Sequence, residues 1–258
     1  MFPNAVQPQK NLLPFGIPSL DEILGGGIPT GSIVLIEDEI GAEANPFILQ
    51  FLAEGLKAGQ YGYIMATEHP YQYFAEMLSG IGVNTDMLKA TGRLKFIDAF
   101  SNPFGYTDLR SEHDLAVRNI SQPRELNEII RRAFLHVRDQ NVIKRGIVSS
   151  LSSIIYAADE SKKTIFSFLQ NRLASNKLDG SVTLFSLHYD AHPRLLVKAM
   201  EHLSDVTIRV KKGFTKEERP LNVVQVINIK GKPELAGESV QFEFISGKII
   251  PYYEENLF

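Results

Sequence analysis

Short apolar runs rich in valine and isoleucine alternate with segments of helical spacing over most of this chain, and this order restricts the fold more than any other feature. Buried parallel strands appear in sequence as such continuous runs, and the helices that connect them cover both faces of the sheet. The runs that predict strands are Ile33–Ile36, Tyr61–Ala66, Leu94–Ile97, Gly146–Val148, Val182–Leu187 and Val206–Val210. The segments that predict helices are Phe47–Leu56, Tyr73–Leu78, Leu126–Val137, Thr164–Leu173 and Leu195–Leu203.

The last part of the chain changes character. Three strand-like segments, Val223–Ile229, Val240–Ile245 and Lys248–Tyr252, follow one another with turn residues and no helical pattern between them. We therefore predict an α/β fold with a mostly parallel central sheet flanked by helices and a C-terminal antiparallel β meander. The polar stretch Phe100–Gln122 has no clear period, and we expect a long surface loop there.

Composition excludes several classes of protein. The 258 residues suit one large α/β domain, and we predict a single domain over residues 1–258. With 27 basic and 30 acidic residues the net charge is −3, so there is no basic excess for nucleic acid or an anionic membrane. The absence of cysteine excludes disulfides, thiolate zinc sites and a thiol nucleophile. No apolar run approaches the ~18 residues of a membrane span, so we expect a cytoplasmic protein with no membrane partner.

The first strong strand leads into a segment with the layout of a phosphate-binding loop. The strand Gly31–Ile36 is followed by a loop containing Gly41 and then by the helix-like segment Phe47–Leu56. In such loops the backbone N–H groups and the helix dipole hold the phosphate, a lysine adds positive charge, and a Ser or Thr hydroxyl binds Mg²⁺. Here the layout is present, but the lysine and the hydroxyl are not.

The segment before this strand carries a resemblance to a known family. Gly16–Ser32, with its run Gly25-Gly26-Gly27, resembles the opening of the KaiC-type ATPases of the RecA superfamily, and Gln50-Phe51 and Glu54-Gly55 match the helix after the loop in that family. The likeness continues weakly through the rest of the chain. It implies a RecA-like, P-loop-type domain.

Under this resemblance the loop departs from the family pattern at its functional positions. Asp38 stands where the family has its first loop glycine, and Gly41 matches a later one. Glu43 replaces the glycine before the lysine, Ala44 the lysine, and Asn45 the residue whose hydroxyl binds Mg²⁺. The complete degenerate loop comprises Asp38, Glu39, Ile40, Gly41, Ala42, Glu43, Ala44 and Asn45.

Three further positions carry over from the family. Ser149 follows the strand Gly146–Val148, where the family has the Walker B aspartate. Glu68 matches the first of two glutamates that activate water, and His69 takes the place of the second. Asn228–Gly231 is similar to the family's K-M-R-G strand, whose basic pair reaches a neighbour's nucleotide, and only Lys230 keeps a positive charge there.

Charge then limits what the loop can bind. Two unit charges ~4 Å apart interact by about 4 kcal/mol at an effective dielectric near 20, so replacing a lysine's attraction by repulsion from Glu43 weakens anion binding by several kcal/mol. Because about 1.4 kcal/mol is a tenfold change in affinity, tight MgATP binding should disappear. We predict no catalytic residues, no metal and no resident cofactor. The alternative is weak ATP or ADP binding through Gly41 and backbone N–H groups.

A second resemblance is closer. Leu35–Asp38, the helix start at Pro46, Phe51–Gly55, Ile147–Ile155 and Leu203–Val206 look like the fourth Elongator subunit. That family has a RecA-like fold without standard Walker motifs and acts in a ring. The resemblance implies an assembly partner and, by analogy, a link to RNA.

Four other groups of residues have both a functional and an ordinary interpretation. His188, Asp190 and His192 form H-x-D-x-H after a strand, which suits a metal, but no further ligand is near in sequence, so we favour a polar strand end. We interpret the acidic cluster of Glu37, Asp38, Glu39 and Glu43 as a solvated turn, and the serines 149, 150, 152 and 153 as a turn and helix cap. Lys211–Lys216 is interpreted as a solvated hairpin tip rather than a single-strand binder.

Three functional hypotheses remain. The first is a non-catalytic RecA/KaiC-like module, a pseudo-ATPase that binds a protein partner, a second copy of itself or an intact KaiC-like paralogue. The second is a weak or atypical nucleotide binder. The third is an RNA-linked scaffold subunit resembling that of Elongator.

Overall fold

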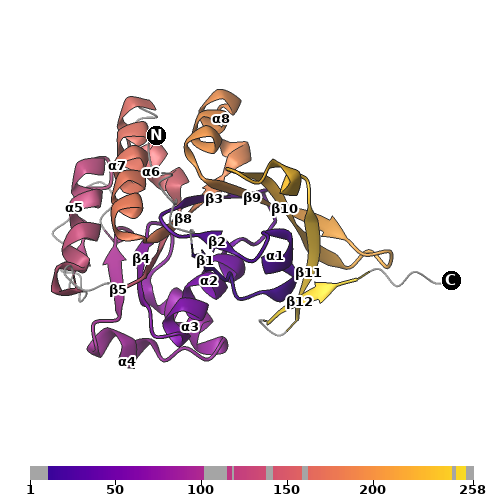
Figure 1. The fold of residues 1–258 in the computed structure, drawn as a ribbon, viewed down its shortest axis with the longest axis horizontal. Helices are drawn as coiled ribbons and strands as arrows, with labels where there is room; N and C mark the ends of the chain where they lie inside the picture. The colour runs from indigo at the N-terminus through magenta and orange to yellow at the C-terminus, as the bar shows by residue number, and fades with distance from the viewer. Residues whose placement is uncertain are drawn as a thin grey trace, which may run out of the picture.

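The computed structural model of this chain describes residues 11–101, 115–117, 119–137, 142–158, 162–245 and 248–253. Within these residues a 10-stranded sheet lies between two layers of helices (Figure 1). The strand order across the sheet is β12-β11-β10-β9-β3-β8-β7-β4-β5-β6. A separate two-stranded ribbon pairs β1 (Leu12–Leu13) with β2 (Ile28–Pro29).

The larger part of the sheet is parallel, as the alternation of strands and helices predicts. All of its neighbouring strands run in one direction, so their carboxyl ends meet at one edge of the sheet, which we call the carboxyl edge. These strands are β3 (Ile33–Asp38), β4 (Tyr61–Ala66), β5 (Leu94–Asp98), β6 (Leu115–Ala116), β7 (Lys144–Ser149), β8 (Val182–His188) and β9 (Val206–Phe214).

The predicted C-terminal meander is also present. β10 (Pro220–Ile229) pairs antiparallel with β9, and β11 (Ser239–Ile245) and β12 (Lys248–Tyr252) extend the sheet in the same way. Because β10 and β9 are antiparallel, β10 begins near the carboxyl edge and ends at the opposite one. Together with the parallel strands, this arrangement confirms the predicted fold class.

Helices cover both faces, and each face has its own buried cluster. One face carries α1 (Pro18–Ile23), α2 (Asn45–Lys57), α3 (Tyr71–Gly80) and α4 (Thr85–Ala90). The other carries α5 (Pro123–Ala133), α6 (Leu151–Ala157), α7 (Lys162–Asp179) and α8 (Arg194–Leu203) (Figure 1). Short 3₁₀ turns follow at Leu135–Val137, Tyr189–Ala191 and Pro233–Leu235.

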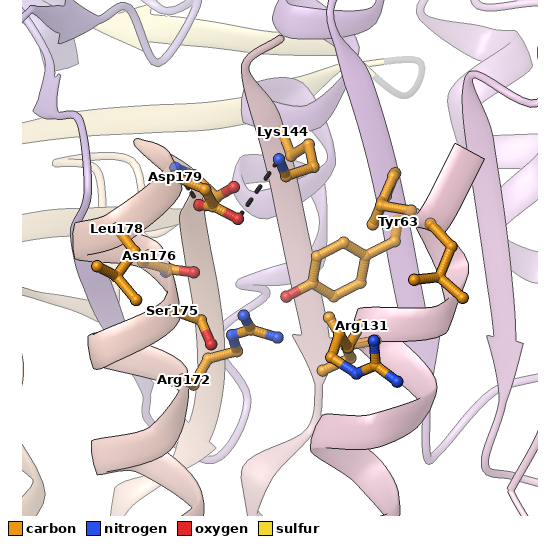
Figure 2. A pocket seen from close by; sticks show the side chains of 12 residues that line it. Tyr63, Arg131, Lys144, Arg172, Ser175, Asn176, Leu178 and Asp179 are labelled. Atoms are coloured by element: carbon orange, nitrogen blue, oxygen red, sulfur yellow. Dashed lines mark hydrogen bonds and ion pairs between the residues drawn. The ribbon is translucent and has the colours of Figure 1, made fainter. Parts of the chain in front are cut away.

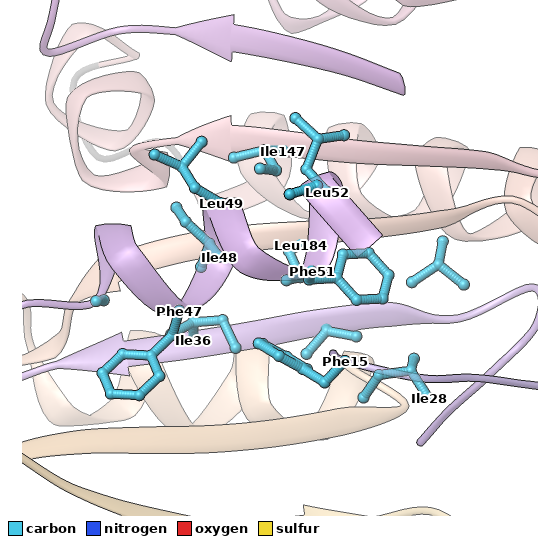
Figure 3. Packing of buried hydrophobic residues seen from close by; sticks show 14 of the residues in the cluster. Phe15, Ile28, Ile36, Phe47, Ile48, Leu49, Phe51, Leu52, Ile147 and Leu184 are labelled. Carbon is cyan, nitrogen blue, oxygen red and sulfur yellow. The ribbon is translucent and has the colours of Figure 1, made fainter. Parts of the chain in front are cut away.

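Helix α2 is the centre of the first face. Its apolar residues point in all directions, because the sheet lies on one side of the helix and the N-terminal segment and other helices surround the remaining sides. Phe47, Phe51 and Leu52 are almost fully buried (Figure 3). Burying each such side chain contributes about 1.5–3 kcal/mol. The guanidinium of Arg145, itself buried, donates to the carbonyl oxygens of Pro14 and Phe51 and so fixes this helix to the strand below it.

The structure differs from the sequence-based expectation in several places. The helices α1 and α4 and the strands β1, β2 and β6 were not predicted, because elements of six or two residues are too short for a periodicity to show. Of α6, seven residues long, only the cap was predicted. The predicted helix Leu126–Val137 is α5 followed by a 3₁₀ turn. Much of the predicted loop Phe100–Gln122 lies outside the described residues, but its end contains β6 and so is not entirely a loop.

Candidate functional site

The expected strand, loop and helix lie at the carboxyl edge in the predicted order. β3 ends at Asp38, residues 39–44 form a turn, and α2 begins at Asn45. Gly41 has a φ of +88°, which favours glycine. The local layout is therefore that of a phosphate-binding loop, and the question is whether its donors are free to bind a phosphate.

Three backbone N–H groups of this loop already have acceptors in the protein. The N–H of Glu39 donates to the carbonyl oxygen of Val210 at 3.0 Å, and that of Ala42 to the carbonyl oxygen of Glu39 at 2.9 Å. The N–H of Glu43 donates to Asn222 Oδ1 at 3.1 Å. An anion site of this type uses such N–H groups as its ligands. Two of these bonds attach the loop to β9 and β10, and the third lies within the loop.

A histidine lies between two acidic residues where the strands end. His188 Nδ1 forms an ion pair with Asp38 Oδ1 at 2.9 Å, and His188 Nε2 lies 3.2 Å from Glu68 Oε2. Ser153 donates a further hydrogen bond to Glu68 Oε1 at 2.8 Å. The residues that the resemblance equates with the first loop glycine and with a water-activating glutamate are thus joined by His188. We call Asp38, His188 and Glu68 the ion triplet.

The two carboxylates keep His188 charged. Its interaction with Asp38 and then with Glu68 raises the pKa of His188 to about 10, although burial acts in the opposite direction. Burial alone would raise the pKa of Glu68, but the hydrogen bonds from His188 and Ser153 hold it below its ordinary value. At neutral pH the triplet therefore consists of an imidazolium between carboxylates.

The two positions that would hold Mg²⁺ in the family contact each other. Ser149 Oγ donates to Asn45 Oδ1 at 3.3 Å, and Asn45 Nδ2 donates to Tyr73 Oη at 2.9 Å. His69, at the second glutamate position, stacks on Tyr73 with a centroid distance of 4.0 Å. A neutral amide and a hydroxyl are weak ligands for a hard cation compared with carboxylates. The side-chain oxygen of Asn45 and the hydroxyl of Ser149 are also already hydrogen-bonded to each other.

The interpretation of the acidic cluster as a solvated turn is wrong for its first two members. Glu37 is fully buried, and Arg209 on β9 reaches its Oε2 at 2.6 Å. Burial raises the pKa of Glu37 to about 7, and the Arg209 guanidinium offsets part of this effect. Asp38 is also buried. The sequence does not show this burial, because Glu37 continues β3 rather than beginning the turn. Among the four acidic residues Glu39 is half-buried and only Glu43 is exposed.

Lys230 lies far from the loop of its own chain. It follows β10 at the edge opposite to the carboxyl edge, where Lys230 Nζ donates to the carbonyl oxygen of Leu203 at 3.0 Å. A cation close to the loop is instead Lys212 on β9, whose N–H donates to Glu39 Oε2 at 3.0 Å. The predicted hairpin tip Lys211–Lys216 is therefore wrong for its first four residues, which belong to β9; the sequence does not show that this strand extends to Phe214 beside the loop.

The H-x-D-x-H residues do not converge. His188 joins the ion triplet, whereas His192 Nε2 lies 2.9 Å from Ser152 Oγ. Among the described residues no group of three or more His, Asp or Glu side chains has the arrangement of a metal site. Ser150 accepts a hydrogen bond from the N–H of Ser152 and caps α6, which confirms the predicted helix cap.

Comparison with known proteins decides the family. The family model described as "ATPase: KaiC" matches residues 13–253. This chain belongs to the KaiC ATPase family. Curated relatives of this KaiC-family chain include the UPF0273 protein of Thermotoga maritima, 36% identical over 54% of the chain and 55% of the relative, and one from Pyrococcus horikoshii, 32% identical over 62% of each. The match thus spans less than two thirds of these relatives.

Solved structures agree on the fold. A KaiC-like protein of Pyrococcus horikoshii OT3 superposes on this KaiC-family chain with a TM-score of 0.70 at 18% identity, covering 95% of this chain and all of the other. An uncharacterized protein of the same organism, solved in complex with an unknown peptide, gives a TM-score of 0.68 at 15% identity over 93% of this chain and all of the other. In the described part of the chain, no helix combines the length and apolarity of a membrane span. The resemblance to the fourth Elongator subunit stays a prediction.

Proposed function

We propose that this KaiC-family chain does not hydrolyse ATP and acts by binding another protein at its carboxyl edge. The observation that carries the proposal is the ion triplet. In the family's pose the loop at Asp38 would face the triphosphate and Glu68 would face the attacking water. Here both carboxylates are instead bound to His188.

Electrostatics supports the absence of hydrolysis. A phosphate in this loop meets the carboxylate of Glu43 and an ion triplet in which two carboxylates outnumber one imidazolium. A single pair of like charges ~4 Å apart repels by about 4 kcal/mol at an effective dielectric near 20. Magnesium would find Asn45 and Ser149 where it needs a hydroxyl and a carboxylate. The acidic groups and the missing magnesium ligands thus both disfavour MgATP binding in this loop.

Exposed apolar side chains support a protein partner at this edge. Ile40 at the tip of the loop is 79% exposed, Phe214 at the end of β9 is 61% exposed, and Ile245 at the end of β11 is 47% exposed. β10 lies between β9 and β11 and pairs antiparallel with both, so Phe214 and Ile245 end their strands on the same side of the sheet as Ile40, at the carboxyl edge. Apolar groups gathered at one edge are typical of an interface. The partner that we propose is a second KaiC-family domain, either another copy or a paralogue.

The absence of turnover is tested by phosphate release from MgATP. We expect the wild-type chain and Glu68→Gln to release phosphate at the same rate as buffer with an equal amount of an inactive control protein. Release that is above this level in the wild type and lost in Glu68→Gln would contradict the proposal, because Glu68 would then act on water.

The interface is tested by sedimentation velocity over the micromolar range, with a KaiC-family paralogue added in a second series. We expect association in one of the two series, and we expect Ile40→Asp with Phe214→Asp to abolish it. Leu178→Asp is the matched control, because Leu178 is 89% exposed at the end of α7, on the opposite edge. Association that survives the double change, or none in either series, would contradict an interface at the carboxyl edge.

A further inference from the structure

A cavity of about 380 Å³ lies away from the ion triplet, toward the amino ends of the parallel strands. It opens between α5 and α7 over the start of β7, on the helical face opposite to α2 (Figure 2). This volume falls within the roughly 300–1,000 Å³ of small-molecule sites. The KaiC-family resemblance assigns no residue here.

A buried guanidinium is directed into this cavity. Arg172 on α7 is only 6% exposed, and Figure 2 shows its guanidinium extending from α7 toward Tyr63 and Arg131. Among the described residues, its Nε has no hydrogen-bond acceptor, and no carboxylate forms an ion pair with it. A buried charged group without a partner destabilises a fold, so an arginine held in this way has the properties of a ligand-binding group.

Two further cationic side chains line the cavity, and ion pairs or hydrogen bonds fix its polar groups in place. Lys144 Nζ is 3.4 Å from Asp179 Oδ2, and the exposed Arg131 pairs with Glu128 at 2.6 Å. Three cationic side chains thus line the cavity against one carboxylate. Tyr63 Oη lies 2.9 Å from Thr183 Oγ1, so the phenol ring is fixed in the cavity wall.

The rest of the wall is apolar. Ile130, Phe134 and Leu135 come from α5 and the turn after it, and Leu178 comes from the end of α7. A purely ionic ligand such as inorganic phosphate would leave these side chains facing water. A ligand that fits the whole cavity combines an anionic group with a compact apolar body.

We propose that this cavity binds a small organic anion, with Arg172 anchoring a carboxylate or phosphate group and the α5 side chains covering the apolar part. The planar guanidinium forms paired hydrogen bonds with either group. The site is independent of the ion triplet and does not rest on the proposed function.

Calorimetric titration with four probes tests the ligand class. The probes are hexanoate, hexyl phosphate, inorganic phosphate and hexanol. We expect at least one of the two amphipathic anions to bind at least about tenfold more tightly than both inorganic phosphate and hexanol, and the stronger of the two identifies the anionic group. Equal affinity for inorganic phosphate, or no binding of either amphipathic anion at millimolar concentration, would overturn the proposal.

Two substitutions test the role of Arg172. Arg172→Gln should reduce affinity for the stronger probe at least about tenfold. The control Arg219→Gln, which changes an exposed arginine in the turn between β9 and β10, should leave the affinity unchanged. Arg172→Leu should not lower the melting temperature of the ligand-free protein, because it removes an unpartnered buried charge. A fall in the melting temperature of Arg172→Leu would show a structural arginine and overturn the proposal, as would unchanged probe binding in Arg172→Gln.

Discussion

Replacing His188 by glutamine should destabilise this protein strongly at neutral pH and much less at high pH. The substitution leaves Asp38 and Glu68, whose side chains are 11% and 26% exposed, without the cation between them. Charges ~4 Å apart interact by about 4 kcal/mol at an effective dielectric near 20. Because 41% of the His188 side chain is exposed, solvent screening reduces the loss to about 1–2 kcal/mol.

The sign of the pH dependence follows from the pKa of His188. This pKa is raised in the folded state from 6.5 to about 10, so the stabilisation is complete below pH 6.5 and is lost as the pH rises through about 10. Urea denaturation of the wild type and His188→Gln at pH 6.5 and pH 10.5 measures this loss, since other groups titrate equally in both proteins. A difference in unfolding free energy that is the same at both pH values would refute the charged triplet.

Two further substitutions test the packing around the site. Arg209→Met leaves the fully buried Glu37 without its cation and should lower the free energy of unfolding by about 3–5 kcal/mol, measured by urea denaturation at pH 8; a loss below about 1 kcal/mol, the value of a surface ion pair, would contradict a buried ion pair. Gly146→Ala places a methyl group in steric overlap with the Tyr63 phenol and should cost about 1–3 kcal/mol in thermal unfolding. An unchanged melting temperature would show that this ring moves freely.

The sequence predicts most of the fold but few of the contacts in the candidate site. Continuous β-branched runs such as Ile33–Ile36 and Val182–Leu187 identify buried parallel strands without any knowledge of their order. The ion triplet depends on that order, because β8 pairs with β3, and only β7 separates it from β4. The sequence therefore indicates that Asp38, Glu68 and His188 end strands, but not that they meet.

The unknown strand order also explains why the sequence does not reveal the environments of Glu37 and Arg172. Glu37 looks like part of an acidic turn until β9 is known to lie beside β3 with Arg209 opposite it. Arg172 is a single arginine on a long helix, and nothing in the spacing of α7 shows that it faces a cavity formed with α5 and β4. Motif resemblance locates the loop, whereas the partners of its side chains come from strands distant in sequence.

Calorimetric titration of the wild-type chain with MgATP shows whether the loop at the carboxyl edge binds a triphosphate. We expect no heat of binding at millimolar nucleotide, for MgATP and for MgADP alike. Saturable binding of MgATP with one site per chain, weakened by Ala44→Glu, would refute the proposed function. The nucleotide would then occupy the loop whose N–H groups are bonded within the protein and whose first residue is bound to His188.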